Sequence, residues 1–455
     1  MKITVYIPTY NYGKYIEKAI NSILSQTIKD WELIIINDGS TDNTKTILKK
    51  YANHSKIRII DQAKKGLSVS NNVALRLSNA KYIMRLDADD YIDENALLVL
   101  SSILDAKPEI GLVYPDYYLI DENDEIMEIV RRKKISEEAL LLDLPAHGAC
   151  TMFRKECLLQ LGGYAEEFKC QDGYELWLRF MDSYKPYNVN IPLFYYRQHN
   201  NNLTKNHKEI LETRRRIKRS FVGRFRKNKI PKVLAIVPVR KQTNVSPEHP
   251  FALLAGKPLL SYTLEQALKA ELLDRIVVTS DSSEVLKYSA RFNNVSTIER
   301  PRQLTASNTR LDAIVRHALN ELKRRDDYKP DAIMILCVNS PLRRSQHIDK
   351  AIDTMVIFNV DTVISVLDEL AFCYFHGNRG LVSIQKSRDL RIEKESIYKE
   401  TGAILLTKIK EINNKTLHGK RIGHINMLPE ESVKIKSHFD LWLAEGILTD
   451  WMKVQ

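Results

Sequence analysis

Short apolar runs alternate with amphipathic segments along the first 90 residues. Four runs rich in β-branched and aromatic residues predict strands at residues 3–7, 31–37, 57–60 and 82–86. Apolar residues at helical spacing predict helices at residues 14–25, 44–51 and 68–77. This alternation is typical of an α/β fold in which helices cover a mostly parallel sheet.

The same rhythm starts again after residue 231. It predicts strands at residues 233–238, 275–279, 332–338 and 362–366, and helices at 261–270, 310–324 and 346–358. The 455 residues also exceed what one hydrophobic core usually supports. We therefore predict two tandem α/β domains, residues 1–204 and 232–455, joined by a basic helical linker at 205–231.

The net charge of +12 is concentrated in that linker. Between Lys205 and Lys232, twelve Lys or Arg residues and two Glu residues leave a net charge of +10. The rest of the chain is nearly neutral, which argues against a nucleic-acid-binding surface. We favour a solvated helix that packs one apolar face on a domain. Peripheral contact of residues 205–232 with anionic lipid is the alternative.

Other compositional features are those of an ordinary globular protein. Hydrophobic residues make up 44% and charged residues 28% of the chain. We find no apolar run of membrane-spanning length and no signal peptide, because the apolar start ends at Pro8. The five cysteines are scattered and lack metal-ligand spacing. We expect a cytoplasmic protein, with the inner face of the cell membrane as the peripheral alternative.

Acidic residues follow the strand expected at 82–86. Asp87, Asp89 and Asp90 would lie beyond its carboxyl end, where open α/β sheets bind ligands. Mg²⁺ and Mn²⁺ prefer one or two carboxylates together with phosphate oxygens. Taken alone, such a short motif is more often a helix-capping loop than a metal site.

Further motifs accompany this turn in a fixed order. They are Ile7-Pro8-Thr9-Tyr10-Asn11, Asn37-Asp38-Gly39-Ser40, Gly162-Gly163-Tyr164, Gln171-Asp172-Gly173-Tyr174-Glu175 and Tyr196-Arg197-Gln198-His199. Over residues 1–205 the set resembles the family 2 glycosyltransferases of the GT-A fold. The resemblance implies a metal-dependent, inverting transfer of a sugar from a nucleoside diphosphate donor, with UDP-sugars favoured.

The resemblance also implies site residues. Asp38 would accept a hydrogen bond from the pyrimidine base, in a pocket lined by Pro8 and Tyr10. Asp87 would lie near the ribose and the metal, and Asp89 would bind Mg²⁺ or Mn²⁺ at the diphosphate. These assignments belong to the family and are carried over onto the matching positions.

On the acceptor side, Asp172 would be the general base. The family often has Glu-Asp where this chain has Gln171-Asp172, and Glu175 is the rival candidate. His199 could contact the metal or diphosphate, with a structural role as the alternative. Trp177 is expected in the core, because Leu176 and Phe180 continue an apolar pattern.

The second domain carries another set of motifs. They include Ala235-Ile236-Val237-Pro238-Val239-Arg240, Gly256-Lys257-Pro258-Leu259-Leu260, Ser340-Pro341-Leu342-Arg343 and Thr401-Gly402-Ala403-Ile404. Over residues 232–448 these resemble the cytidylyltransferases that activate nonulosonic acids. The two resemblances together imply two tandem Rossmann-like nucleotide-binding domains. Two departures stand out: the loop at 241–250 lacks glycine, and Lys434-Ile435-Lys436 replaces the family's Asp-Ile-Asp magnesium pair.

These departures predict a catalytically inactive second domain. A lysine beside a divalent ion would repel it by roughly 8 kcal/mol at an effective dielectric near 20. We expect this domain to form a homo-oligomer, dock a partner, or sense a nucleotide or sugar. The whole chain would then be a glycosyltransferase acting on a glycan or lipid-linked acceptor in bacterial surface polysaccharide synthesis. The rivals are a bifunctional glycosyltransferase and CMP-sugar synthetase, and a non-catalytic scaffold.

Overall fold

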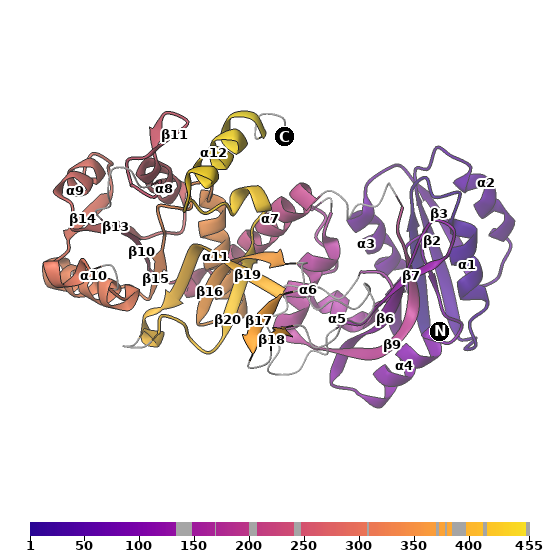
Figure 1. Cartoon of the computed structure of the whole chain (residues 1–455). Helices are drawn as coiled ribbons and strands as arrows, with labels where there is room; N and C mark the ends of the chain where they lie inside the picture. Colours follow the sequence, from indigo (N-terminus) through magenta and orange to yellow (C-terminus); the bar gives the residue numbers. More distant parts are fainter. Residues whose placement is uncertain are drawn as a thin grey trace. The chain divides into compact units, whose positions relative to one another are not determined.

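The computed structural model describes residues 1–132, 148–168, 170–199, 207–240, 247–306, 309–369, 373–377, 380–384, 397–412 and 416–451. The chain forms two compact α/β units, the first from Met1 to Ile217 and the second over most of the chain from Lys218 onward. The division falls inside a single helix, α7 (His207–Phe225). Figure 1 shows the elements of both units.

The first unit is built on one mixed sheet. Its strand order is β3-β2-β1-β4-β8-β6-β9-β5, with β7 paired to β6. The bounds are β1 Ile3–Thr9, β2 Trp31–Asp38, β3 Ile57–Gln62, β4 Tyr82–Arg85, β5 Tyr91–Ile92, β6 Ile110–Ile120, β7 Ile126–Val130, β8 Met152–Arg154 and β9 Lys185–Arg197. The first four strands in the order are parallel, so their carboxyl ends share one edge of the sheet.

Helices cover both faces of this sheet (Figure 1). They are α1 Ile16–Leu24, α2 Thr44–Leu48, α3 Leu67–Leu77, α4 Ala96–Ala106, α5 Lys155–Gln160 and α6 Asp172–Ser183. Alternate residues of β1 enter opposite cores: Ile3, Val5 and Ile7 pack with α1, α2 and α4, whereas Tyr6 packs with α3, α5 and α6. Burial on both faces explains why β1 and β2 read as nearly continuous apolar runs. Trp177 lies in the second core, as expected.

The second unit has its own mixed sheet, ordered β14-β13-β10-β15-β19-β16-β20. The strands are β10 Val233–Pro238, β13 Arg275–Ser280, β14 Val295–Glu299, β15 Ala332–Ile335, β16 Thr362–Glu369, β19 Ile397–Lys408 and β20 Ile422–Asn426. Two short pairs lie outside it, β11 Leu253–Leu254 with β12 Lys257–Pro258, and β17 Tyr374–Gly377 with β18 Gly380–Ser383. Its helices are α8 Leu259–Lys269, α9 Ser283–Ser289, α10 Leu311–Asp326, α11 Ser345–Phe358 and α12 His438–Gly446. The α/β architecture predicted for both halves is confirmed, and both sheets contain antiparallel pairs besides their parallel strands.

The two sheets share one topology. In each, four parallel strands are followed by an antiparallel strand and then by two strands parallel to each other. The match extends to single residues. The Leu86 amide donates to the Tyr6 carbonyl at 2.9 Å, and the Leu336 amide donates to the Ile236 carbonyl at 3.0 Å. Positions in one unit can therefore be matched to positions in the other.

The expected basic linker is largely the helix α7. Within the first unit, Arg214 donates to the side chain of Gln171 and lies over the ring of Tyr174. Within the second unit, Lys218 is fully buried and donates to Thr354, 3.3 Å away. Many of the basic side chains thus contact protein groups. Among the described residues, no helix is both long and apolar enough to cross a membrane.

Candidate active site

The predicted donor-binding residues lie at the carboxyl ends of β1 and β2. Pro8 is buried in β1 opposite Ile36 of β2, and Tyr10 follows the end of β1. The Lys64 ammonium lies over the Tyr10 ring, 3.8 Å from its centroid. A basic group therefore flanks the aromatic ring that was predicted to line the base pocket.

Asp38 is the last residue of β2 and is 5% exposed. Its carboxylate accepts hydrogen bonds from Gln62 Nε2 at 2.7 Å, and from the amides of Lys65 and Gly66, both at 2.8 Å. Gly66 has φ of +98°, a conformation that favours glycine. Asp38 thus holds the chain between β3 and α3 against the end of β2, besides any contact it makes with a donor.

The acidic turn after β4 brings Asp89 together with His199. The Asp89 Oδ2 atom lies 2.9 Å from His199 Nε2, although the two residues are 110 positions apart. The His199 ring stacks on Tyr15 with centroids 5.5 Å apart and meets Tyr12 edge-on at 6.1 Å. Burial raises the pKa of Tyr12, and the nearby carboxylate of Asp89 raises it further. The structure thus brings Asp89 and His199 together, and their role in metal binding stays a prediction.

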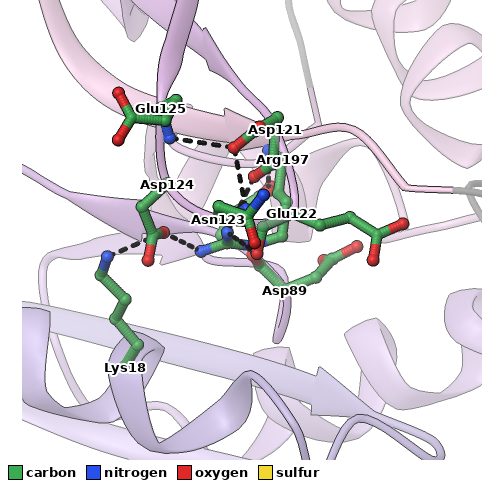
Figure 2. Close-up of polar contacts among 9 residues, drawn as sticks. Lys18, Asp89, Asp121, Glu122, Asn123, Asp124, Glu125 and Arg197 are labelled. Carbon is green, nitrogen blue, oxygen red and sulfur yellow. Dashed lines mark hydrogen bonds and ion pairs between the residues drawn. The ribbon is translucent and has the colours of Figure 1, made fainter.

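Arg197 holds the backbone of this turn (Figure 2). It is 2% exposed and donates through Nε to the Asp89 carbonyl at 2.9 Å. Its guanidinium also contacts the Asp121 carbonyl and the Asp124 carboxylate, which in turn pairs with Lys18 of α1. The acidic turn, the β6–β7 connection and α1 are therefore tied together by one buried arginine.

Asp90 serves the same network rather than the open site. It is 1% exposed, and its Oδ1 atom accepts the backbone amide of Arg197 at 2.9 Å. Burial raises the pKa of Asp90 well above its ordinary value, and the neighbouring carboxylates of Asp89 and Asp87 add to the shift. Asp90 is thus built into the support of the turn.

Asp172, the predicted base, is the first residue of α6 and is 7% exposed. Its Oδ2 atom accepts hydrogen bonds from Arg85 Nη1 at 2.6 Å and from Asn71 Nδ2 at 2.9 Å. Arg85 also pairs with Asp87, with Nε 2.9 Å from Oδ1. Arg85 therefore places the predicted base beside the acidic turn.

Asp87 lies in the same charged group. Burial raises the pKa of Asp87 to about 6, the Arg85 guanidinium opposes this rise, and the carboxylates of Asp89 and Asp172 add to it. Its side chain is nonetheless 27% exposed, so it can be reached from solvent. The site thus has an accessible carboxylate next to a buried ion pair.

The rival base, Glu175, is engaged elsewhere. Both of its oxygens accept hydrogen bonds from Arg179, at 2.7 and 2.5 Å, and both side chains are 11% exposed. Arg179 also donates to the carbonyls of Leu161 and Gly163. Glu175 therefore helps to anchor α6 to the turn after α5.

We expect Glu175→Gln to reduce stability while sparing turnover. The substitution leaves a mostly buried Arg179 without its charge partner, which should cost about 3–5 kcal/mol and lower Tm. The kcat for sugar transfer should change by less than about 3-fold, because Glu175 is engaged by Arg179 and is not the expected base. Loss of a general base would lower kcat by at least about 100-fold. Thermal unfolding and steady-state kinetics of the same preparation separate the two effects. If the folded variant instead loses about 100-fold or more in turnover, Glu175 returns to the base assignment.

A divalent ion fits the residues that are present. Asp89 and His199 offer an oxygen and a nitrogen within 3 Å of each other. Mg²⁺ and Mn²⁺ commonly use one or two protein ligands together with phosphate oxygens and water. Among the described residues no group of three or more His, Cys, Asp or Glu side chains could hold a metal alone. The donor diphosphate would therefore have to complete the coordination.

Sequence reasoning missed Arg85 and Asn71 and assigned no role to Arg197. The signal available in the sequence was an arginine at the end of an expected or observed strand, Arg85 in β4 and Arg197 in β9. Arginine is rarely buried unless its charge is paired. A buried arginine needs an acidic or hydrogen-bonding partner, and the motifs predicted for the site supplied several carboxylates as candidates. Part of the glycine-poor loop of the second unit, residues 241–246, lies outside the described residues.

Comparison with known proteins assigns the first unit. Residues 4–162 match the family described as Glycosyl transferase family 2. This segment is a family 2 glycosyltransferase domain. Within the second unit, residues 234–374 match the family described as Cytidylyltransferase. The resemblances to family 2 glycosyltransferases and to cytidylyltransferases are thereby confirmed, and the nonulosonic-acid substrate class stays a prediction.

Several curated proteins are similar to the family 2 domain. The Escherichia coli chondroitin synthase is 46% identical over 96 residues, 21% of this chain and 14% of that protein. The Pasteurella multocida chondroitin synthase is 30% identical over 182 residues, 40% of this chain and 19% of that protein. The match to an Escherichia coli β-1,3-glucosyltransferase, WfgD, is 29% identical over 39% of this chain and 69% of the relative. The chain thus spans less than a fifth of the two synthases.

Among solved structures, Staphylococcus aureus TarS 1–349 is 20% identical, with a TM-score of 0.41. The alignment covers 49% of this chain and 66% of that structure.

Proposed function

We propose that the first unit transfers a sugar from a nucleoside diphosphate donor to an acceptor hydroxyl with inversion at the anomeric carbon. One observation carries this proposal. Arg85 contacts both Asp87 and Asp172, so the acidic turn and a carboxylate suited to general-base work lie side by side. The acidic turn follows the carboxyl end of the parallel strand β4, where α/β sheets bind their ligands, and Arg85 joins Asp172 at the start of α6 to this end.

On the donor side, the residues at the ends of β1, β2 and β4 contact different parts of the nucleotide. Asp38, Pro8 and Tyr10 bind the base, and Asp87 approaches the ribose. Asp89 and His199 would hold Mg²⁺ or Mn²⁺ at the donor diphosphate. When bound, this ion neutralises negative charge on the leaving diphosphate.

On the acceptor side, Asp172 receives the proton. The acceptor oxygen forms a bond to the anomeric carbon while the bond from that carbon to the diphosphate oxygen breaks. The hydroxyl proton passes to Asp172, and the nucleoside diphosphate leaves from the opposite face, which inverts the configuration. Positioning and charge stabilisation supply most of the rate enhancement in such a displacement.

The relatives support a UDP-sugar donor and a surface glycan as product. WfgD is named as a glucosyltransferase from UDP-Glc to a GlcNAc-diphosphoundecaprenol acceptor, and two other relatives are named as chondroitin synthases. We infer that this chain takes a UDP-sugar and a glycan or lipid-linked acceptor, as in bacterial surface polysaccharide synthesis.

A donor panel tests the proposal. The full chain is incubated with Mn²⁺ and each of several UDP-, TDP- and GDP-sugars, and release of the nucleoside diphosphate is measured with and without oligosaccharide acceptors. We expect release from at least one UDP-sugar, stimulated by an acceptor. No release from any donor, despite a folded chain, would favour the scaffold alternative.

We also propose that the second unit binds a nucleotide without turning it over. By the shared topology, Pro238 and Asp281 match Pro8 and Asp38 of the first unit. The positions of Asp87 and Asp89, however, hold Cys337 and Asn339 in the second unit. The second unit therefore retains the residues that match the predicted base-binding positions and lacks the carboxylates of the acidic turn.

The positions that match His199 and Asp172 also lack the side chains expected to be needed for transfer. The Gln198 amide donates to Ile120 and the Met427 amide donates to Val366, so Leu428 stands where His199 does. No α-helix lies among the described residues between β19 and β20, so nothing there matches α6 with its Asp172. The Lys434 ammonium lies beside Gly402 of β19: a Cβ built on that glycine would be 2.8 Å from it. A cation there would repel a divalent ion.

A pyrophosphate assay tests this second proposal. The full chain, Mg²⁺, CTP and a nonulosonic acid are combined, and pyrophosphate release is followed by a coupled enzyme. We expect no release above the rate without protein, because the metal-binding carboxylates are replaced. A parallel sample with added pyrophosphate shows that the coupling enzymes work. Sustained release would establish the bifunctional alternative.

A further inference from the structure

Arg85 occupies an unusual place for an arginine. It is the last residue of the central strand β4, and it is only 6% exposed. Its Nε atom lies 2.9 Å from Asp87 Oδ1, and its Nη1 atom lies 2.6 Å from Asp172 Oδ2. A buried guanidinium needs its charge matched and its N–H groups largely hydrogen-bonded. Asp87, two residues along the chain, and Asp172, 87 residues along, balance the charge; Nη2 donates to Asp87 at 3.4 Å and Nη1 donates to Asp172, whereas Nε–H makes no hydrogen bond in the described part of the chain.

The surrounding backbone leaves room for this guanidinium. A Cβ atom added to Gly148 would lie 2.4 Å from Arg85 Nη2, closer than real atoms approach. Gly173, next to Asp172, in turn lies against the backbone of Gly148. Two glycines therefore allow β4, the segment before β8 and the start of α6 to meet around one side chain.

The hydrogen bonds at Asp172 distinguish its two oxygens. Oδ2 accepts from both Arg85 and Asn71, and Asn71 is itself fully buried in α3. Within the described part of the chain, no residue donates a hydrogen bond to Oδ1. The carboxylate is thus held by one oxygen, and the other is available to an incoming hydroxyl.

We propose that Arg85 is a positioning residue for the transfer reaction. It fixes the Asp172 carboxylate so that Oδ1 receives the acceptor proton, and it links the base to Asp87 on the donor side. The planar guanidinium suits this role, because its N–H groups point at two carboxylates in fixed directions, whereas a lysine offers one point charge. This inference rests on the proposed glycosyltransferase function.

The experiment measures kcat and the KM values of donor and acceptor for the full-length wild type, Arg85→Lys and Arg85→Ala. Misplacing a reacting group by about 1 Å can cost about 100-fold in rate. We expect Arg85→Ala to lower kcat by about 100-fold and Arg85→Lys by about 10-fold, with the donor KM nearly unchanged. Millimolar guanidinium should restore part of the activity lost in Arg85→Ala, because it supplies the missing fork.

Arg154→Ala is the matched control. Arg154 belongs to β8 of the same sheet, and its guanidinium donates to the backbone carbonyls of Leu104, Lys107 and Ile110, away from the site. Its loss should lower Tm but leave kcat within about 3-fold, and guanidinium should not stimulate the variant. The comparison separates loss of positioning from general loss of stability.

Each outcome is decisive. An Arg85→Ala or Arg85→Lys enzyme with wild-type kcat overturns the assignment, as does a loss that guanidinium leaves unchanged and that Arg154→Ala reproduces. If Arg85→Ala does not fold, the 10-fold effect expected for Arg85→Lys decides the question. A wild-type chain that transfers no sugar overturns the proposed function together with this inference. An active wild type with an unaffected Arg85 variant overturns the inference alone.

Discussion

Replacing Asp172 by asparagine should lower kcat for sugar transfer by about 10²–10⁴-fold, the usual contribution of a general base. Asparagine keeps the size of the side chain and can still accept hydrogen bonds from Arg85 and Asn71 through its carbonyl oxygen. Its amide nitrogen would then face the acceptor and could not take up a proton. The variant should therefore fold and bind the donor normally.

The measurement combines steady-state kinetics with calorimetric binding of UDP in the presence of Mn²⁺. Asp105→Asn is a suitable control. Asp105 belongs to α4, accepts a hydrogen bond from Tyr82 at the start of β4 and pairs with Lys2 and Lys81 near the surface. Its variant should retain kcat. Undiminished turnover by Asp172→Asn would move the base role to another group.

The central elements of both units could be predicted because their signals are local. The strand predicted at 31–37 is β2 (Trp31–Asp38), and the helix predicted at 68–77 is α3 (Leu67–Leu77). Strands buried on both faces are continuous apolar runs, and the helices that cover them are amphipathic. Neither pattern depends on distant parts of the chain.

The strands β6 and β9, which lie between β8 and β5 in the first sheet, could not be predicted in the same way. β9 (Lys185–Arg197) contains Pro186 and Pro192, and β6 (Ile110–Ile120) has Asp116 near its middle. Both sequences resemble loops, because proline and aspartate are depleted in strands. These strands form because they pair with each other, and that pairing is a long-range property.

The same limit applies to the site. Asp38, Asp87, Asp89 and Asp172 belong to motifs that can be recognised one at a time. Their supports cannot, because Arg85 meets Asp172 across 87 positions. The donors to Asp38 include the backbone amide of Gly66, whose left-handed conformation has no periodic signature. A charged residue in an apolar strand was the only local sign of this network.

Removing the divalent ion should produce the second large effect. We expect excess chelator to abolish transfer and Mn²⁺ to restore it, because the ion would neutralise negative charge on the leaving diphosphate. Asp89→Asn should raise the Mn²⁺ concentration for half-maximal activity and lower kcat by about 10²–10³-fold, the usual loss for a group that stabilises developing charge. His199→Ala should also raise the Mn²⁺ concentration for half-maximal activity and lower kcat, but by less than Asp89→Asn, because a neutral imidazole contributes no negative charge.

Asp93→Asn provides the control for the metal experiments. Asp93 lies four residues beyond Asp89, and its Oδ1 atom accepts the amide of Asn95 at 2.8 Å, a bond that asparagine can keep. This variant should show an unchanged Mn²⁺ dependence. Transfer that persists in chelator, with Asp89→Asn as active as the wild type, would contradict the metal assignment. The Asp89–His199 contact would then be a structural hydrogen bond, and the exposed Lys64, whose ammonium lies over the Tyr10 ring, would become the main candidate to neutralise the leaving group.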